Sequence, residues 1–93
     1  PKNFYLSQNF PNPFNLQTII RYNIPKSIFV KLTIYDLTGR EIAQLINSFQ
    51  SIGNKSVKWN ALNNQGQLVS AGVYLYSIEA GGFRQIKKMI LLK

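Results

Sequence analysis

The sequence of 93 residues predicts an all-β domain, folded as an antiparallel sandwich of about seven strands. Short runs of β-branched and aromatic residues alternate with polar residues, and turn residues separate the runs at the spacing of a sandwich or barrel. Apolar residues make up 45% of the chain and charged residues 15%. This composition is typical of a folded domain and unlike that of a disordered tail or a coiled coil. The length suits one domain with one core.

The first segment differs from the rest. It carries the sequence Asn-Phe-Pro-Asn-Pro-Phe-Asn at residues 9–15. Proline lacks a backbone donor and pushes the preceding residue to extended geometry, so we expect an extended lead-in over residues 1–17 without a regular ladder. The sandwich should then occupy residues 18–93. Residues 18–24 and 28–36 both alternate, and the second run is the clearest strand pattern in the chain.

Residues 36–39, Asp-Leu-Thr-Gly, have the composition of a hairpin turn. The segment that follows is ambiguous, because residues 38–41 fit a capping box and four apolar residues also fit a helical spacing. These four are Ile42, Leu45, Ile46 and Phe49. We expect a strand over about residues 41–47, since the segment is short and its neighbours are strands.

The remaining expected elements are strands at residues 54–60, 73–80 and 83–93, turns at residues 63–66 and 81–82, and an optional short strand at residues 67–69. Gly81-Gly82 is a two-residue hairpin signal, so the last two strands should be neighbours. Short connections favour an immunoglobulin-like sandwich, here without the Cys pair of antibody domains. The expected core comprises Ile20, Tyr22, Val30, Leu32, Ile34, Val57, Trp59 and one face of residues 73–80.

The composition excludes several kinds of site. There is no His and no Cys, so zinc sites built on these residues, Cys nucleophiles and His-based triads are impossible within the chain. Asp36, Glu41 and Glu79 are the only carboxylate side chains. Asn60, Asn63 and Asn64 are better explained as turn residues than as Ca²⁺ ligands, because no acidic residue lies near them. We expect no enzymatic activity, no metal and no cofactor.

The basic charge has several interpretations. Lys and Arg number 11 against 3 Asp and Glu, which gives a net charge of +8. Such a domain attracts phosphate backbones, but its charges are dispersed and its aromatic residues fall on core-like faces, so nucleic acid is not expected. Trp59, Tyr74 and Tyr76 could form a sugar platform, although the strand position of Trp59 favours the core. Only Arg84, Lys87, Lys88 and Lys93 crowd together.

Six short motifs follow one another along the chain. They are residues 6–15, Leu-Ser-Gln-Asn-Phe-Pro-Asn-Pro-Phe-Asn; residues 18–22, Thr-Ile-Ile-Arg-Tyr; residues 35–42, Tyr-Asp-Leu-Thr-Gly-Arg-Glu-Ile; residues 57–60, Val-Lys-Trp-Asn; residues 70–76, Ser-Ala-Gly-Val-Tyr-Leu-Tyr; and residues 87–93, Lys-Lys-Met-Ile-Leu-Leu-Lys. The ordered series resembles the type A C-terminal sorting domain of the type IX (Por) secretion system. It departs from that family at Asn60, where Asp is usual. Part of it is also similar to the immunoglobulin-like domain of flagellar hook-capping proteins.

The resemblance implies a function. Residues 1–93 would form a single non-catalytic sorting domain and be a fragment of a longer secreted cargo protein. The domain would carry its cargo from the periplasm through the outer membrane, to be secreted or attached to the surface. Its implied partners are a translocon shuttle and a sortase-like peptidase, with acidic lipopolysaccharide as a further partner for the basic last strand.

The expected recognition residues lie in the last two strands. They are Gly72, Val73, Tyr74, Lys87, Lys88 and Lys93. The terminal strand is also expected to present an edge that can pair with a partner strand. The alternative interpretation is an accessory β-sandwich of a secreted enzyme, which binds carbohydrate or acts as a spacer.

Overall fold

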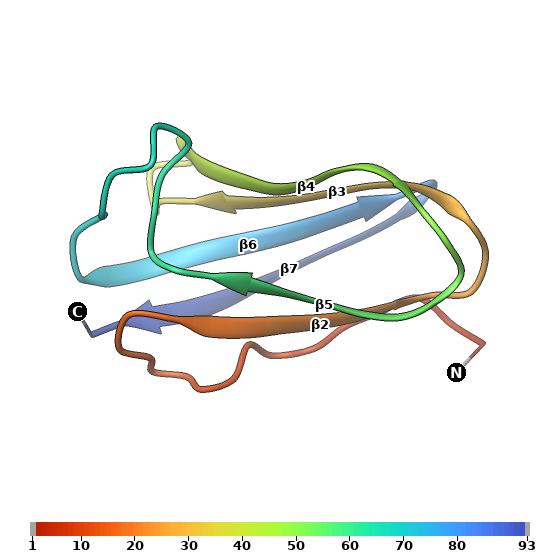
Figure 1. Ribbon diagram of the computed structural model, residues 1–93, viewed down its shortest axis with the longest axis horizontal. Coiled ribbons are helices and arrows are strands. Elements are labelled where there is room, and N and C mark those ends of the chain that lie inside the picture. The colour runs from red at the N-terminus through yellow and green to blue at the C-terminus, as the bar shows by residue number, and fades with distance from the viewer. Residues whose placement is uncertain (1, 93) are drawn as a thin grey trace.

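The computed structural model describes residues 2–92, and this part of the chain contains seven strands and no helix. The strands are β1 (Tyr5–Leu6), β2 (Thr18–Ile24), β3 (Ile28–Tyr35), β4 (Glu41–Gln50), β5 (Gly53–Trp59), β6 (Gly72–Ala80) and β7 (Phe83–Leu91). They form a three-stranded sheet in the order β1-β2-β5 and a four-stranded sheet in the order β4-β3-β6-β7. Figure 1 shows the two sheets lying face to face. The all-β sandwich is therefore confirmed.

The core lies between the two sheets and is filled mainly by alternate residues of β2, β3, β6 and the end of β7, as the period of two requires, while β4 and β5 each bury one residue. Its largest fully buried side chains are Trp59, Tyr22, Tyr76, Phe14, Ile20, Ile24, Leu32, Ile34, Ile78, Met89, Leu91 and Val30. Trp59 is 2% exposed, and its ring makes an edge contact with Tyr74 at 5.5 Å between centroids. The predicted core is confirmed with one exception. Val57 is only partly buried and packs against the core from its rim.

Two details of the prediction are wrong. Residues 67–69 form no strand, and only an isolated bridge joins Leu62 to Leu68. The lead-in, expected to have no regular ladder, instead contains the seventh strand, β1, where Tyr5 pairs with Asn23 and Leu6 with Tyr22. Leu6 is buried, so this short ladder is fixed by one apolar anchor that enters the core. The ambiguous segment is a strand, as expected, and β4 is longer than predicted.

Two turns of the domain share one geometry. In residues 36–40 and in residues 63–67, the first side-chain oxygen accepts hydrogen bonds from the backbone N–H groups two and four residues later. The first N–H donates to the carbonyl of the fifth residue, and the first carbonyl accepts from the N–H of a glycine. Gly39 and Gly66 have φ of 89° and 78°, which glycine adopts without strain. Asp-x-x-Gly and Asn-x-x-Gly therefore produce the same turn.

Candidate functional site

The β6–β7 hairpin carries most of the residues that the sequence singles out. Its turn is Gly81-Gly82, and the ladder runs without a register shift from Ala80 opposite Phe83 to Gly72 opposite Leu91. Gly81 has φ of 61°, and a Cβ there would lie 2.7 Å from Ile28 Cδ1. That terminal methyl group would have to shift to admit a side chain, and the left-handed φ is one that glycine adopts without strain, so glycine suits this turn position. The hairpin forms one side of the four-stranded sheet, with β7 as its edge strand.

The outward-facing side of this hairpin is apolar around a single lysine. Five side chains alternate with the buried residues of β6 and β7, and we call them the hairpin face: Val73, Leu75, Ile86, Lys88 and Ile90. Lys88 is exposed and lies opposite Leu75, between Ile86 at 52% exposure and Ile90 at 36%. Exposed apolar side chains that adjoin one another are typical of contact surfaces.

The charges of the hairpin are arranged asymmetrically. Arg84 Nη1 lies 3.1 Å from Glu79 Oε2, its cross-strand neighbour. Within residues 2–92 the only other ion pair joins Arg40 to Asp36, so the ammonium group of Lys88 has no carboxylate partner there. Lys87 is partly buried and lies on the opposite side of the strand, across from Tyr76. Lys88 is thus the one cation of the hairpin face, and it has no ion pair within residues 2–92.

The other expected recognition residues lie in different surroundings. Gly72 begins β6 and Val73 belongs to the hairpin face. Tyr74 points into the core with 6% exposure, and its hydroxyl donates to the Ser70 carbonyl at 2.5 Å. Tyr74 therefore supports the hairpin from within and offers a partner little surface. Lys93 lies outside the described residues.

The lead-in covers the last part of the β7 edge, an arrangement that the sequence did not predict. Four hydrogen bonds join it to the outer backbone groups of the strand. Gln8 Nε2 donates to the Lys88 carbonyl at 2.7 Å, Ile90 N donates to Asn12 Oδ1 at 3.0 Å, Phe14 N donates to the Ile90 carbonyl at 2.9 Å, and Leu92 N donates to the Phe14 carbonyl at 2.8 Å. The segment that begins as β1 on one sheet therefore ends on the edge of the other.

Tyr76 fixes the lead-in to the hairpin from below. Its buried hydroxyl accepts a hydrogen bond from Asn9 N at 2.8 Å and donates one to the Ser7 carbonyl at 2.7 Å. Burial raises the pKa of Tyr76 to about 12, against the opposing effect of the Asn9 hydrogen bond. The side-chain Nδ2 of Asn9 also donates to Thr18 Oγ1 at 3.0 Å. Sequence reasoning missed these roles, because they join residues far apart in the chain.

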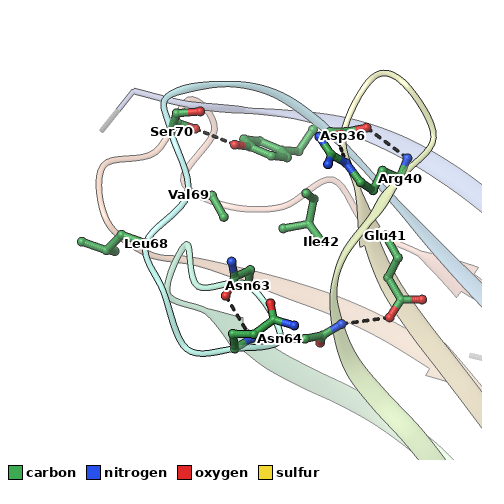
Figure 2. A pocket seen from close by; sticks show the side chains of 11 residues that line it. Asp36, Arg40, Glu41, Ile42, Asn63, Asn64, Leu68, Val69 and Ser70 are labelled. Carbon is green, nitrogen blue, oxygen red and sulfur yellow. Dashed lines mark hydrogen bonds and ion pairs between the residues drawn. The ribbon is translucent and has the colours of Figure 1, made fainter.

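A second candidate region is a polar hollow of about 570 Å³ at one end of the sandwich. Figure 2 shows Ile42 and Val69 facing into it, with Asp36 and Arg40 on one side and Asn63 on the other. The Thr38 hydroxyl, followed by the other donors of the turn, lowers the pKa of Asp36 to about 2. That carboxylate is saturated with hydrogen bonds inside its own turn and has a structural role.

Neither region holds a cluster of side chains that could ligate a metal ion. Among residues 2–92 no group of three His, Cys, Asp or Glu side chains lies close enough to hold a metal ion. The same part of the chain has no helix of the length and apolar character needed to span a membrane.

Comparison with known families agrees with this description. The profile described as "Secretion system C-terminal sorting domain" matches residues 8–92. The chain belongs to this family. A sorting domain of this family is a non-catalytic signal of the type IX secretion system, and it directs export to the cell surface or secretion. No curated protein sequence matches the chain.

Solved structures give the same picture. Dimeric latent PorU from Porphyromonas gingivalis matches with a TM-score of 0.72 and 26% identity, over 90% of this chain and 9% of that one. PorZ, an essential surface component of the type IX system of the same organism, matches with a TM-score of 0.65 and 22% identity, over 97% of this chain and 11% of that one. FlgD from Pseudomonas aeruginosa matches with a TM-score of 0.63 and 19% identity, over 80% of this chain and 60% of that one. The sorting domain thus spans a small part of PorU and PorZ, and its likeness to PorZ and FlgD concerns the fold.

Proposed function

We propose that this sorting domain acts as a folded signal and that the type IX translocon recognises it by binding its β6–β7 hairpin. The observation that carries the proposal is the hairpin face, where an unpaired lysine stands among exposed apolar side chains. An exposed charge contributes little to stability, so Lys88 is free to serve recognition. The apolar neighbours supply contact area, and the lysine adds selectivity for an acidic group on the partner.

The proposed site has direct and supporting residues. Val73 and Lys88 contact the partner, together with Leu75, Ile86 and Ile90. Gly72 begins β6 and Tyr74 packs in the core behind the hairpin face, so both residues support the start of this strand. Lys87 adds positive charge beside the lead-in, and Lys93 extends the basic character beyond the described residues.

The proposed partners are those of a cargo signal. A shuttle and a sortase-like peptidase of the translocon bind the domain while its cargo is in the periplasm. Acidic lipopolysaccharide is a further partner for the basic strand, since it offers the negative charge that the net charge of +8 attracts. Residues 1–93 act as one domain, covalently part of a larger secreted protein.

The test is export of a periplasmic reporter fused to these residues, in a host with the translocon. We expect the Lys88→Ala, Lys93→Ala variant to fold normally but to accumulate in the periplasm. The matched control is Lys26→Ala, Lys58→Ala, which removes the same charge elsewhere and should be exported like the parent. Equal export of both variants would rule out recognition through the basic hairpin.

A further inference from the structure

Within residues 2–92, no segment pairs with one part of the β7 edge. The lead-in bonds to this edge only from the Lys88 carbonyl onward. At the start of the strand, the Phe4 ring stacks on Phe83 with 5.0 Å between centroids and 11° between planes. Between these two contacts lie residues 84–88, which pair with β6 on one side and with no strand on the other. We call this segment the open edge.

The direction of the backbone groups in the open edge follows from the ladder. The four bonds to the lead-in use the outer groups of Lys88, Ile90 and Leu92, so even-numbered residues direct N–H and C=O away from β6. Because the ladder has no register shift, Arg84 and Ile86 do the same. A row of unpaired donors and acceptors about five residues long therefore faces outward, which is the geometry that accepts an added strand.

The side chains of the open edge define what that strand should carry. The even-numbered residues Arg84, Ile86 and Lys88 are exposed and share the outward face. Arg84 pairs with Glu79 through Nη1 alone, so its guanidinium keeps further N–H donors for a second carboxylate. On an added strand, alternate residues would lie opposite them, whichever way the strand runs. The complementary pattern is acidic, any, apolar, any, acidic.

The same side chains disfavour a second copy of this edge as the occupant. Two copies paired antiparallel about Ile86 would set Arg84 of each opposite Lys88 of the other. Like charges directly opposite one another destabilise a strand pair. The net charge of +8 adds a longer-range repulsion between copies. An acidic strand from another protein suffers neither penalty.

We infer that the open edge accepts an extended acidic segment of a partner protein by strand addition, with an apolar residue on Ile86 and carboxylates at Arg84 and Lys88. This deepens the proposed function and rests on it, because it names the kind of partner segment that the hairpin would bind. The Gln8 bond to the Lys88 carbonyl sets the limit of the added strand.

The test is NMR titration of the isotope-labelled 93-residue chain with two capped pentapeptides, Glu-Thr-Val-Thr-Glu and Lys-Thr-Val-Thr-Lys. The acidic peptide should shift the amide signals of residues 84–88 and slow hydrogen exchange at Ile86 and Lys88. Two exposed charge pairs should make the lysine peptide bind roughly tenfold more weakly. Added salt should weaken binding of the acidic peptide and reduce the difference in affinity between the two peptides.

Three variants locate the binding. Arg84→Gln, Lys88→Gln should reduce affinity for the acidic peptide by roughly tenfold. The matched control Arg21→Gln, Lys58→Gln neutralises one Arg and one Lys on the other sheet and should bind like the parent. Ile86→Pro removes an outward N–H while the bonds to β6 remain, so it should abolish binding. If the proline variant does not fold, the glutamine pair still decides the question.

Several results would overturn the inference. They are equal binding of the two peptides, shifts confined to another edge, and concentration-dependent shifts of residues 84–88 without peptide, which would make a second copy the occupant. The reporter assay separates this inference from the proposed function. If Lys88→Ala, Lys93→Ala loses export but the two peptides bind equally, the proposed function is supported and the addition of an acidic strand is contradicted. If the acidic peptide binds more tightly but that variant is exported normally, strand addition is supported and the role of the basic hairpin in export is contradicted.

Discussion

The Tyr76 hydroxyl is the most testable link between the lead-in and the hairpin. Tyr76→Phe keeps the ring in the core and removes only the oxygen that bonds Asn9 N and the Ser7 carbonyl. Asn9 N would lose its acceptor in a buried position, and a lost hydrogen bond that leaves a buried group unpaired costs about 1–3 kcal/mol. With the weaker loss at the Ser7 carbonyl, we expect a fall of roughly 2–3 kcal/mol in the free energy of unfolding.

The measurement is chemical and thermal unfolding followed by circular dichroism. For a domain of this size the expected loss lowers Tm by roughly 10–20 °C. The control is Tyr35→Phe, since the partly exposed Tyr35 has no side-chain hydrogen bond within residues 2–92. It should change stability by less than about 0.5 kcal/mol. If both variants unfold alike, the hydroxyl does not hold the lead-in.

The same group predicts a dependence on high pH. Burial disfavours the charged form and raises the pKa of Tyr76 to about 12, so the folded protein keeps this proton to a higher pH than the unfolded chain does. Above pH 10 the unfolded chain releases this proton while the folded chain retains it. The contribution of Tyr76 to the free energy of unfolding is therefore complete below pH 10 and falls as the pH rises toward 12. Tyr76→Phe should lose less stability over this interval than the parent.

Two further predictions concern the core and the first turn. Trp59→Ala should cost about 3–5 kcal/mol in denaturant unfolding, because the ring is buried against Phe14 and Tyr74; a cost below about 1 kcal/mol would contradict its burial. Asp36→Asn should be tolerated, since Asn63 forms the same turn, whereas Asp36→Ala should destabilise it. The lowered pKa of Asp36 makes its contribution complete above pH 3.8 and lost as the pH falls toward 2, and acid unfolding that is unchanged in Asp36→Asn would contradict this.

The strands could be predicted because their alternation is local. The Gly81-Gly82 turn and the clear face of β3 are visible in short windows of sequence, and the structure confirms both. The helical spacing after residue 41 was accidental, since Phe49 is 72% exposed on β4 and packs no helix face. Its neighbours in the sheet, and not its own spacing, decide that segment.

The lead-in could not be predicted in the same way. Its positions depend on Asn9 meeting Tyr76 and on Asn12 meeting Ile90, contacts between residues more than 60 positions apart. Proline removes the periodicity that would reveal such pairing. The orientation of β6 was equally hidden, because apolar residues occupy both of its faces. The sequence pattern therefore places Tyr74 among the recognition residues, whereas the structure buries it in the core.

The most direct measurement of the central claim is the destination of a reporter. The reporter carries an N-terminal export signal and ends with residues 1–93, and it is expressed in matched hosts with and without the type IX translocon. The account predicts reporter outside the cells only when the translocon is present, and retention in the periplasm otherwise. Retention in both hosts, despite a folded domain, would contradict the claim that this domain is a sorting signal.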